Sequence, residues 1–297
     1  MHYSGLTYRP PYEATSLLLQ VTSGCSHNAC TFCTMYDKVR FRESPLSEIR
    51  EDVWEAGLRR PHTTRVFLEN GDAFCLPAER LLEIAEIIRE ELPEVREIAG
   101  YARIPNIIDK TDDELRALAE AGFADFNVGV ESALDDVLDF MNKGYDVATA
   151  REQLLRLREA GVPFSVNIIN AAAGPKRIAE HAAANAAFVN EVQPYLVFVS
   201  PLHIDPGSKL ETIAADGGFE ESTLGEYIAE EIAFLEGLEL EDSTFFGLHV
   251  SNPVPVLGQL PRDKEALLDA LREGMEAIPQ WALDSHPSKG AEGRLYL

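Results

Sequence analysis

Short apolar runs alternate with longer amphipathic stretches along most of the chain. The apolar runs predict six strands, at residues 16–22, 64–69, 97–101, 125–131, 163–170 and 195–200. Between them, apolar residues spaced three and four apart predict helices at 46–58, 77–91, 112–121, 148–160 and 176–192. Strands that alternate with helices in this way are typical of βα units and a mainly parallel sheet.

Local signals support the helix boundaries. Ser44 and Pro45 precede the first predicted helix, and Thr111 with Glu114 has the spacing of a capping box. Gly122 and Gly161 follow the third and fourth helices, where glycine commonly ends a helix.

The pattern changes after Pro201. It predicts a loop over 202–218, helices at 224–235 and 264–277, and a Pro/Gly-rich segment over 252–261. We therefore expect an α/β fold: an open (β/α)6 partial TIM barrel over residues 1–205, and an α-rich C-terminal extension over 206–297 that packs on or caps it. In such barrels the chemistry lies at the carboxyl ends of the strands.

Composition narrows the possible partners. The 297 residues include 26 Lys plus Arg against 50 Asp plus Glu, which gives a net charge of −24, and 45% are hydrophobic. This is a globular composition, and its acidity disfavours nucleic acid as the main partner. Residues 1–16 lack the apolar core of a signal peptide, and no later segment is apolar enough to span a bilayer. We expect a cytoplasmic protein without membrane association.

Three of the four cysteines lie within nine residues, directly after the first predicted strand. These are Cys25, Cys30 and Cys33, whereas Cys75 stands alone. A disulfide framework would spread its cysteines in pairs, so the cluster indicates a metal site. Three thiolates suit a [4Fe–4S] cluster with one open iron. The alternatives are a zinc site that adds His27 as a ligand, and three unconnected core cysteines.

The loop from Gly24 to Cys33, with Phe32 just before its last cysteine, resembles the radical S-adenosylmethionine (radical SAM) superfamily. The likeness is greatest to the branch that includes coproporphyrinogen oxidases and methylthiotransferases. It implies that the three cysteines hold a [4Fe–4S] cluster, and that S-adenosylmethionine is cleaved reductively to a 5′-deoxyadenosyl radical. One departure is that four residues separate the first two cysteines, where the family usually has three.

The resemblance extends over about residues 15–205 and implies a set of cofactor-binding residues at the strand ends. These are Phe32 for the adenine, Gly71 and Asp72 for the methionine ammonium, Glu131 for the ribose or methionine part, Lys143 for the carboxylate, and Asn167 for the ribose. The family's glycine-rich end of the fifth strand is replaced here by Ala171-Ala172-Ala173-Gly174.

Five further residues are candidates for contact with a substrate. Tyr101 and Arg103 follow the third strand and are candidate catalytic residues. Cys75, His249 and Asn252 are candidate substrate contacts. Each also has an ordinary structural interpretation, as a packed aromatic, a surface cation, a small buried thiol or a satisfied polar group.

The leading hypothesis is a radical SAM enzyme that abstracts hydrogen from a small-molecule or peptide substrate. The family implies a flavodoxin or ferredoxin as reductant. RNA methylthiotransfer is disfavoured by the acidic charge and by the lack of cysteines for a second cluster. Two alternatives remain: an iron–sulfur electron-transfer or sensor protein that does not cleave S-adenosylmethionine, and a zinc-binding structural protein.

Overall fold

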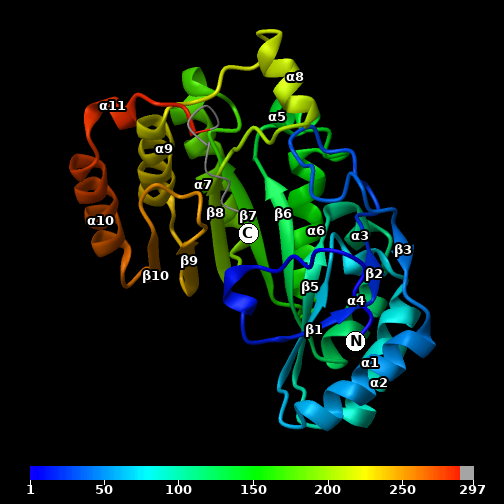
Figure 1. Cartoon of the computed structure of the whole chain (residues 1–297). Helices are drawn as coiled ribbons and strands as arrows, with labels where there is room; N and C mark the ends of the chain where they lie inside the picture. The colour runs from blue at the N-terminus through cyan, green and yellow to red at the C-terminus, as the bar shows by residue number, and fades with distance from the viewer. Residues whose placement is uncertain (288–297) are drawn as a thin grey trace. The chain divides into compact units, whose positions relative to one another are not determined.

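The computed structural model describes residues 1–287 (Figure 1). One sheet contains eight strands, which are β1 (Leu17–Gln20), β4 (Arg65–Glu69), β5 (Glu97–Ala102), β6 (Phe123–Glu131), β7 (Phe164–Asn170), β8 (Leu196–Pro201), β9 (Ser243–Gly247) and β10 (Val256–Leu260). A small second sheet pairs β2 (Thr22–Ser23) with β3 (Arg42–Glu43).

The helices follow the strands along the chain. They are α1 (Leu46–Arg59), α2 (Ala78–Glu91), α3 (Ile104–Ile108), α4 (Asp112–Glu120), α5 (Asp135–Phe140), α6 (Val147–Glu159), α7 (Ile178–Val192), α8 (Lys209–Ala215), α9 (Leu224–Gly237), α10 (Lys264–Ala277) and α11 (Gln280–Leu283). Short 3-10 turns occur at Pro11–Glu13, Ala73–Cys75 and Pro175–Arg177. No helix among residues 1–287 has the length and apolar character needed to cross a membrane.

The large sheet has the strand order β1-β4-β5-β6-β7-β8-β9-β10 and is not closed. Strands β1, β4, β5 and β6 pair in parallel along the chain, as the βα pattern predicts, and β8 pairs in parallel with β9. Strand β10 returns antiparallel to β9. The predicted α/β fold with an open sheet is confirmed, and all six predicted strands are present.

The C-terminal part differs from the prediction because it adds two strands. Strand β9 lies where the pattern predicts no element, β10 lies in the predicted Pro/Gly-rich segment, and α8 lies within the predicted loop. Each of these elements is seven residues or shorter, so it shows too few periods to be recognised from the pattern alone. Helices α3, α5 and α11 are absent from the prediction for the same reason.

The chain divides into two compact units, which are taken separately below. The first comprises residues 1–28, 35–129 and 152–165. Helices α1 and α2 pack together there (Figure 1) and bury apolar residues at three- and four-residue spacing, for example Ile49, Val53 and Ala56 on α1. Helix α4 begins at the predicted capping box, where the Glu114 amide donates to Thr111 Oγ1 over 3.2 Å.

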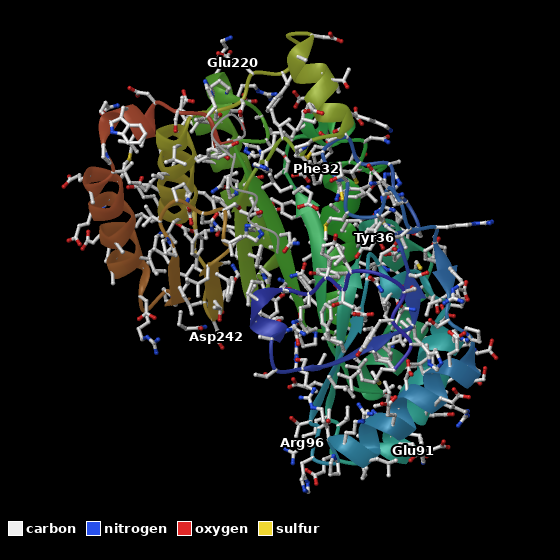
Figure 2. All side chains as sticks on the ribbon, viewed as in Figure 1. Phe32, Tyr36, Glu91, Arg96, Glu220 and Asp242 are labelled. Atoms are coloured by element: carbon white, nitrogen blue, oxygen red, sulfur yellow. The ribbon has the colours of Figure 1, made fainter. Side chains whose placement is uncertain are left out.

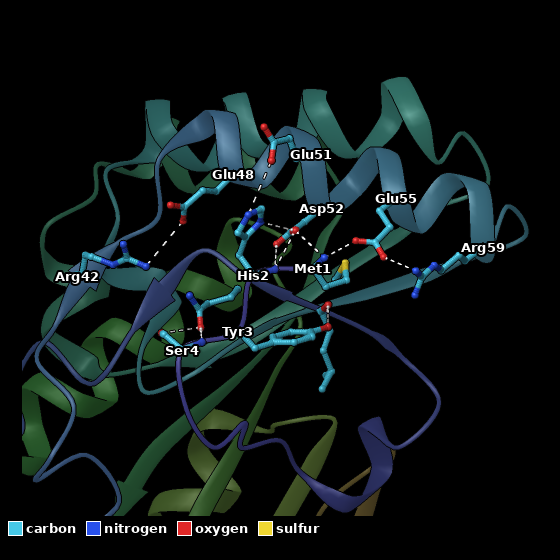
Figure 3. Close-up of polar contacts among 12 residues, drawn as sticks. Met1, His2, Tyr3, Ser4, Arg42, Glu48, Glu51, Asp52, Glu55 and Arg59 are labelled. Carbon is cyan, nitrogen blue, oxygen red and sulfur yellow. Dashed lines mark hydrogen bonds and ion pairs between the residues drawn. The ribbon is translucent and has the colours of Figure 1, made fainter.

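The first residues of the chain belong to this unit and make polar contacts with α1 (Figure 3). The His2 amide donates to Asp52 of α1 over 2.9 Å, and the Ser4 amide donates to Gln20 Oε1 over 2.8 Å. Farther along, Asn127 Nδ2 donates to the Tyr12 hydroxyl over 2.6 Å. The N-terminal segment is therefore bound to β1, β6 and α1 by polar contacts.

The second unit comprises residues 29–34, 130–151 and 166 onward. Helices α7 and α9 lie side by side in it (Figure 1). They approach closely because their facing residues are small: a Cβ added at Gly237 would lie 2.8 Å from the Cβ of Ala186. Two carboxylates of α9, Glu230 and Glu231, are buried in this unit.

Candidate functional site

The turn after β4 packs directly against the first cysteine of the loop. A Cβ added at Gly71 would lie 2.6 Å from the Cβ of Cys25, and the Gly71 amide donates to the Gly24 carbonyl over 3.1 Å. Only glycine allows this approach. The strand end and the cysteine loop are therefore held in one arrangement by the absence of a side chain at position 71.

Asp72 fastens the same loop by hydrogen bonds. It is fully buried, and its Oδ1 accepts from the Ser26 amide over 2.9 Å while Oδ2 accepts from the Ser26 hydroxyl. Burial raises the pKa of the Cys25 thiol, and the Asp72 charge raises it further. Both carboxylate oxygens thus have partners within the protein, and Asp72 positions the residues around Cys25.

Glu69, just before this turn, has a carboxylate oxygen that accepts no hydrogen bond from the described residues. It is fully buried as the last residue of β4, and burial raises its pKa to about 7. Its Oε2 has no hydrogen-bond partner among the described residues, and neither has Nε2 of Gln20, its register partner on β1. Buried polar groups normally find partners, so this pair is suited to contact a bound polar ligand. The sequence motif contains Glu69, but its spacing alone does not distinguish it from the last residue of an ordinary strand.

The second half of the cysteine loop is held by the turn after α5. Thr31 donates its amide to the Met141 carbonyl over 3.1 Å and its hydroxyl to the Phe140 carbonyl over 3.1 Å. Asn142 Nδ2 donates to the Ala29 carbonyl over 2.8 Å. The segment that carries Cys30 and Cys33 is therefore held by one backbone hydrogen bond and two side-chain hydrogen bonds within the second unit.

Phe32, which Figure 2 labels, packs against a buried apolar cluster of the second unit. Members of this cluster include Met141 and Leu210. Phe140 and Phe219 pack against the same cluster and stack on each other with ring centroids 5.5 Å apart. The ring of Phe32 thus anchors the second half of the cysteine loop to this cluster.

Glu131 and Lys143, each predicted to contact the cofactor, contact one another. Lys143 Nζ lies 2.9 Å from Glu131 Oε1, and the two residues are only 4% and 8% exposed. Burial disfavours the ammonium, but the Glu131 charge outweighs it and raises the pKa of Lys143; Cys30 adds to this effect. The pair therefore places a compensated charge near the second cysteine.

Polar groups without partners also occur on β7. The Oδ1 atoms of Asn167 and Asn170 are buried, and neither has a hydrogen-bond partner among the described residues. An unpaired amide oxygen inside an otherwise apolar strand costs free energy unless a ligand donates to it. The sequence predicts Asn167 as a cofactor contact but not Asn170, because Asn170 lies at a strand end where polar residues are common.

The other candidates of the first unit have clear local roles. The ring of Tyr101 packs edge-on against Phe67 with centroids 5.3 Å apart, and burial raises the pKa of its hydroxyl. Arg103 precedes α3, where its amide donates to Asn106 Oδ1 over 2.7 Å, and its charge counteracts part of the rise in the Cys25 pKa.

Cys75 ends a 3-10 turn, and burial raises the pKa of its thiol to about 12, so the thiol stays protonated at neutral pH. Its surroundings include the buried Lys110, whose ammonium donates to the Phe74 carbonyl over 2.7 Å and lies 4.1 Å from the centre of the Phe74 ring. The position of Cys75 outside the proposed ligand set stays a prediction.

His249 and Asn252 belong to the second unit. Asn252 Nδ2 donates to the carbonyls of Val199 and Gly247 over 2.9 Å and 2.8 Å and so joins the ends of β8 and β9. The His249 ring lies edge-on to Phe198 with centroids 5.8 Å apart. Burial lowers the pKa of His249, and His203 lowers it further, so the ring is neutral at pH 7.

The donor set fits an iron–sulfur cluster. All four cysteines are free and half-buried. Among residues 1–287 no group of three or more His, Cys, Asp or Glu side chains is already gathered in a metal-binding arrangement. The metal assignment therefore depends on three soft thiol donors within nine residues and on the packing of Gly71 and Asp72 around the first of them.

Comparisons with known proteins agree with this interpretation. The family model described as the radical SAM superfamily matches residues 19–176. No curated protein matches the chain.

Three solved structures resemble the fold at low sequence identity. They are methylornithine synthase (PylB; TM-score 0.52, 16% identity, 76% of this chain and 63% of that one), coproporphyrinogen III oxidase (HemN) from Escherichia coli (TM-score 0.55, 21% identity, 74% and 52%), and the archaeal Methanocaldococcus infernus Elp3 (TM-score 0.54, 14% identity, 88% and 63%). The chain thus spans between about half and two thirds of the length of these proteins.

Proposed function

Because the chain belongs to the radical SAM superfamily, whose members are enzymes that use a [4Fe–4S] cluster and S-adenosylmethionine, we propose that Cys25, Cys30 and Cys33 ligate that cluster. The observation that carries the proposal is the close contact between Gly71 and Cys25. It lies inside the matched region and joins the cysteine loop to a strand end that the family uses for the cofactor. When bound, the cluster supplies the electron that cleaves S-adenosylmethionine and releases a 5′-deoxyadenosyl radical.

The protein's own residues bind and orient the cofactor in this proposal. Glu69, with its unpaired buried oxygen, accepts from the methionine ammonium, while Gly71 and Asp72 hold the loop that presents Cys25. Asn167, whose buried Oδ1 has no partner among the described residues, would accept from a ribose hydroxyl, and Glu131 would contact the ribose or the methionine part. Lys143, which is paired with Glu131, would bind the cofactor carboxylate. Tyr101 and Arg103 remain candidates for substrate contact.

The substrate is proposed to be a small molecule or a peptide, and the reductant a flavodoxin or ferredoxin. The net charge of −24 argues against a polyanionic substrate such as RNA. The similar structures include a methylornithine synthase and a coproporphyrinogen III oxidase. Proteins of this fold thus perform different reactions, so the fold alone does not select the substrate.

The test is anaerobic reconstitution with iron and sulfide, followed by dithionite and S-adenosylmethionine. We expect the optical and electron paramagnetic spectra of a [4Fe–4S] cluster, and formation of 5′-deoxyadenosine. Cys25→Ala, Cys30→Ala and Cys33→Ala should each abolish cluster binding, and Cys75→Ala, the matched control, should retain it.

Other outcomes would contradict the proposal in distinguishable ways. A normal cluster without 5′-deoxyadenosine, and without any spectral change on addition of S-adenosylmethionine, would indicate an electron-transfer or sensor protein. Stoichiometric zinc in anaerobically purified protein would indicate a structural zinc site. Retention of the cluster in Cys30→Ala would overturn the ligand assignment.

A further inference from the structure

A continuous buried hydrogen-bond network lies in the second unit. His181 on α7 is fully buried, and its Nδ1 lies 2.7 Å from Oε1 of Glu230 on α9. Its Nε2 lies 2.9 Å from the hydroxyl of Ser132, which directly follows β6. Glu230 and Ser132 are 0% and 1% exposed. The network therefore links two helices to the carboxyl end of a strand.

The network also holds backbone at the ends of two strands. Glu230 Oε1 accepts from the Ala171 amide, just after β7, over 2.8 Å. Beyond β6, Ser132 Oγ accepts from the Leu134 amide over 3.2 Å. The Ala133 amide donates over 2.7 Å to Asn185, which lies one turn after His181 on α7. Glu230 thus holds the turn after β7, and Ser132 and Asn185 hold the turn after β6.

These two strand ends have an unfavourable backbone conformation. Glu131 has φ +69° and Ala171 has φ +60°, the left-handed region that glycine adopts freely and other residues seldom do. A residue other than glycine persists there only when its surroundings fix it. The hydrogen bonds from Glu230 and from Ser132 and Asn185 provide that fixation at or beside each strained residue.

The two ring nitrogens of His181 face different partners. Nδ1 faces Glu230 Oε1, whereas Nε2 faces the Ser132 hydroxyl and lies 3.2 Å from the side-chain nitrogen of Asn185. The order serine, histidine, carboxylate is that of a nucleophilic triad, but no member is accessible to a substrate. The network is therefore a positioning element.

We propose that His181, together with Glu230 and Ser132, is a positioning residue that sets the turns after β6 and β7 for S-adenosylmethionine. The inference rests on the proposed function, because these turns adjoin Glu131 and Asn167, to which that function assigns contacts with the cofactor. Without the network, the strained residues relax toward ordinary conformations. The protein then binds the cofactor more weakly, although its three cysteines are unaffected.

The experiment compares His181→Leu, which removes both hydrogen bonds at similar volume, with the conservative Glu230→Gln. Glu231→Gln is the matched control. Glu231 is the next residue after Glu230, its carboxyl group is also buried, and its Oε1 has no partner among residues 1–287. Four quantities are measured on the reconstituted full chain: iron content, melting temperature, the dissociation constant for S-adenosylmethionine, and hydrogen exchange of peptides covering 130–135 and 168–174.

For His181→Leu we expect a normal iron content and hydrogen exchange that is faster by about tenfold or more in both peptides. The dissociation constant for S-adenosylmethionine should rise by a similar factor, because one buried hydrogen bond contributes about that much free energy. Glu230→Gln keeps an acceptor for the Ala171 amide and should give a smaller change. Glu231→Gln should leave exchange and binding within about twofold of the wild type.

Three results would overturn the proposal or separate it from the proposed function. In His181→Leu, both turns could exchange faster while the dissociation constant stays within about twofold of wild type. The network would then stabilise the turns without affecting cofactor binding, and the proposal would be wrong. If His181→Leu does not fold, Ser132→Ala replaces it, and unchanged exchange of the Leu134 amide would reject the proposed role. If wild-type protein with a full cluster binds no S-adenosylmethionine, the proposed function fails, whereas the exchange data still report on the network.

Discussion

Lys143 Nζ lies 2.9 Å from Glu131 Oε1, in a pair of side chains that are almost completely buried. In the sequence, the two residues are separate candidates for contact with the cofactor, twelve positions apart. The structure shows that each already compensates the charge of the other. A single substitution therefore changes stability as well as any contact with the cofactor that we propose for them.

Removing one member of this pair should destabilise the protein strongly. Glu131→Gln leaves an ammonium buried without its counter-charge, and we expect the free energy of unfolding to fall by about 3–5 kcal/mol. Lys143→Met should have an effect of similar size. The double variant should regain part of the loss, because no buried charge remains unpaired. Urea unfolding of all four proteins measures this, and additive losses in the double variant would show that the pair is not coupled.

Gly71→Ala should disturb the cysteine loop. Its Cβ would lie 2.6 Å from Cys25 Cβ and 2.7 Å from the Gly24 carbonyl oxygen, so the loop has to move. We expect a marked loss of bound iron after reconstitution, along with a lower melting temperature. Gly225→Ala is the control. Gly225 lies in α9, and its added Cβ would be 3.4 Å from Leu283, which is an ordinary contact distance. Equal iron contents in the two variants would refute the argument from close approach.

Glu69→Gln and Asp72→Asn should separate ligand binding from loop positioning. Glu69 has an unpaired buried oxygen, so its charge is expected to matter mainly for the affinity of S-adenosylmethionine, by about tenfold or more. Asp72 accepts two hydrogen bonds from Ser26, so its substitution should lower iron content first. Calorimetric titration and iron analysis distinguish the two effects. The reverse pattern would assign the cofactor contact to Asp72.

The buried carboxyl of Glu231 predicts a pH-dependent stability. Burial raises its pKa to about 8 in the folded protein, against 4.5 for an ordinary glutamate. Between these values the folded state keeps a proton that the unfolded chain releases, so the Glu231 contribution is full below pH 4.5 and is lost as the pH rises to about 8. Glu231→Gln should remove this loss.

The stability of Glu231→Gln relative to wild type should therefore rise from pH 5 to pH 8, by at most about 1.4 kcal/mol per pH unit. Chemical unfolding at several pH values measures the difference between the two proteins. A difference that stays constant over this range would contradict the assignment.

The elements that could be predicted from the sequence are those with several periods of apolar spacing. Helices such as α1 and α10 begin at the expected residue because their buried face repeats over three or more turns. Strand β9, by contrast, is short and contains Gly247, and β10 follows a segment with Pro253 and Pro255. The pairing of β9 with β10 stabilises strand structure that the local sequence does not favour, and such pairing depends on the tertiary fold.

Some residues of the candidate site could likewise be recognised from the local sequence, and others could not. Clustered cysteines and a turn such as Asn70-Gly71-Asp72 are visible locally, because the residue types and their spacing are unusual together. The bonding of Asp72 to Ser26 depends on how two distant loops meet. His181 and Glu230 are 49 residues apart and lie on separate helices, so nothing in either neighbourhood marks them as partners. Such pairs require the fold to be known.

The left-handed conformation of Ala171 has a consequence for evolution within the superfamily. Glycine at this position would adopt the conformation without external support, so the selective advantage of a carboxylate at position 230 would diminish. Positions 171 and 230 should therefore covary among close relatives: alanine or a larger residue with Glu230, and glycine with a freer choice on α9. In this chain, the hydrogen bond from the Ala171 amide to Glu230 supports a backbone conformation that glycine adopts without such support.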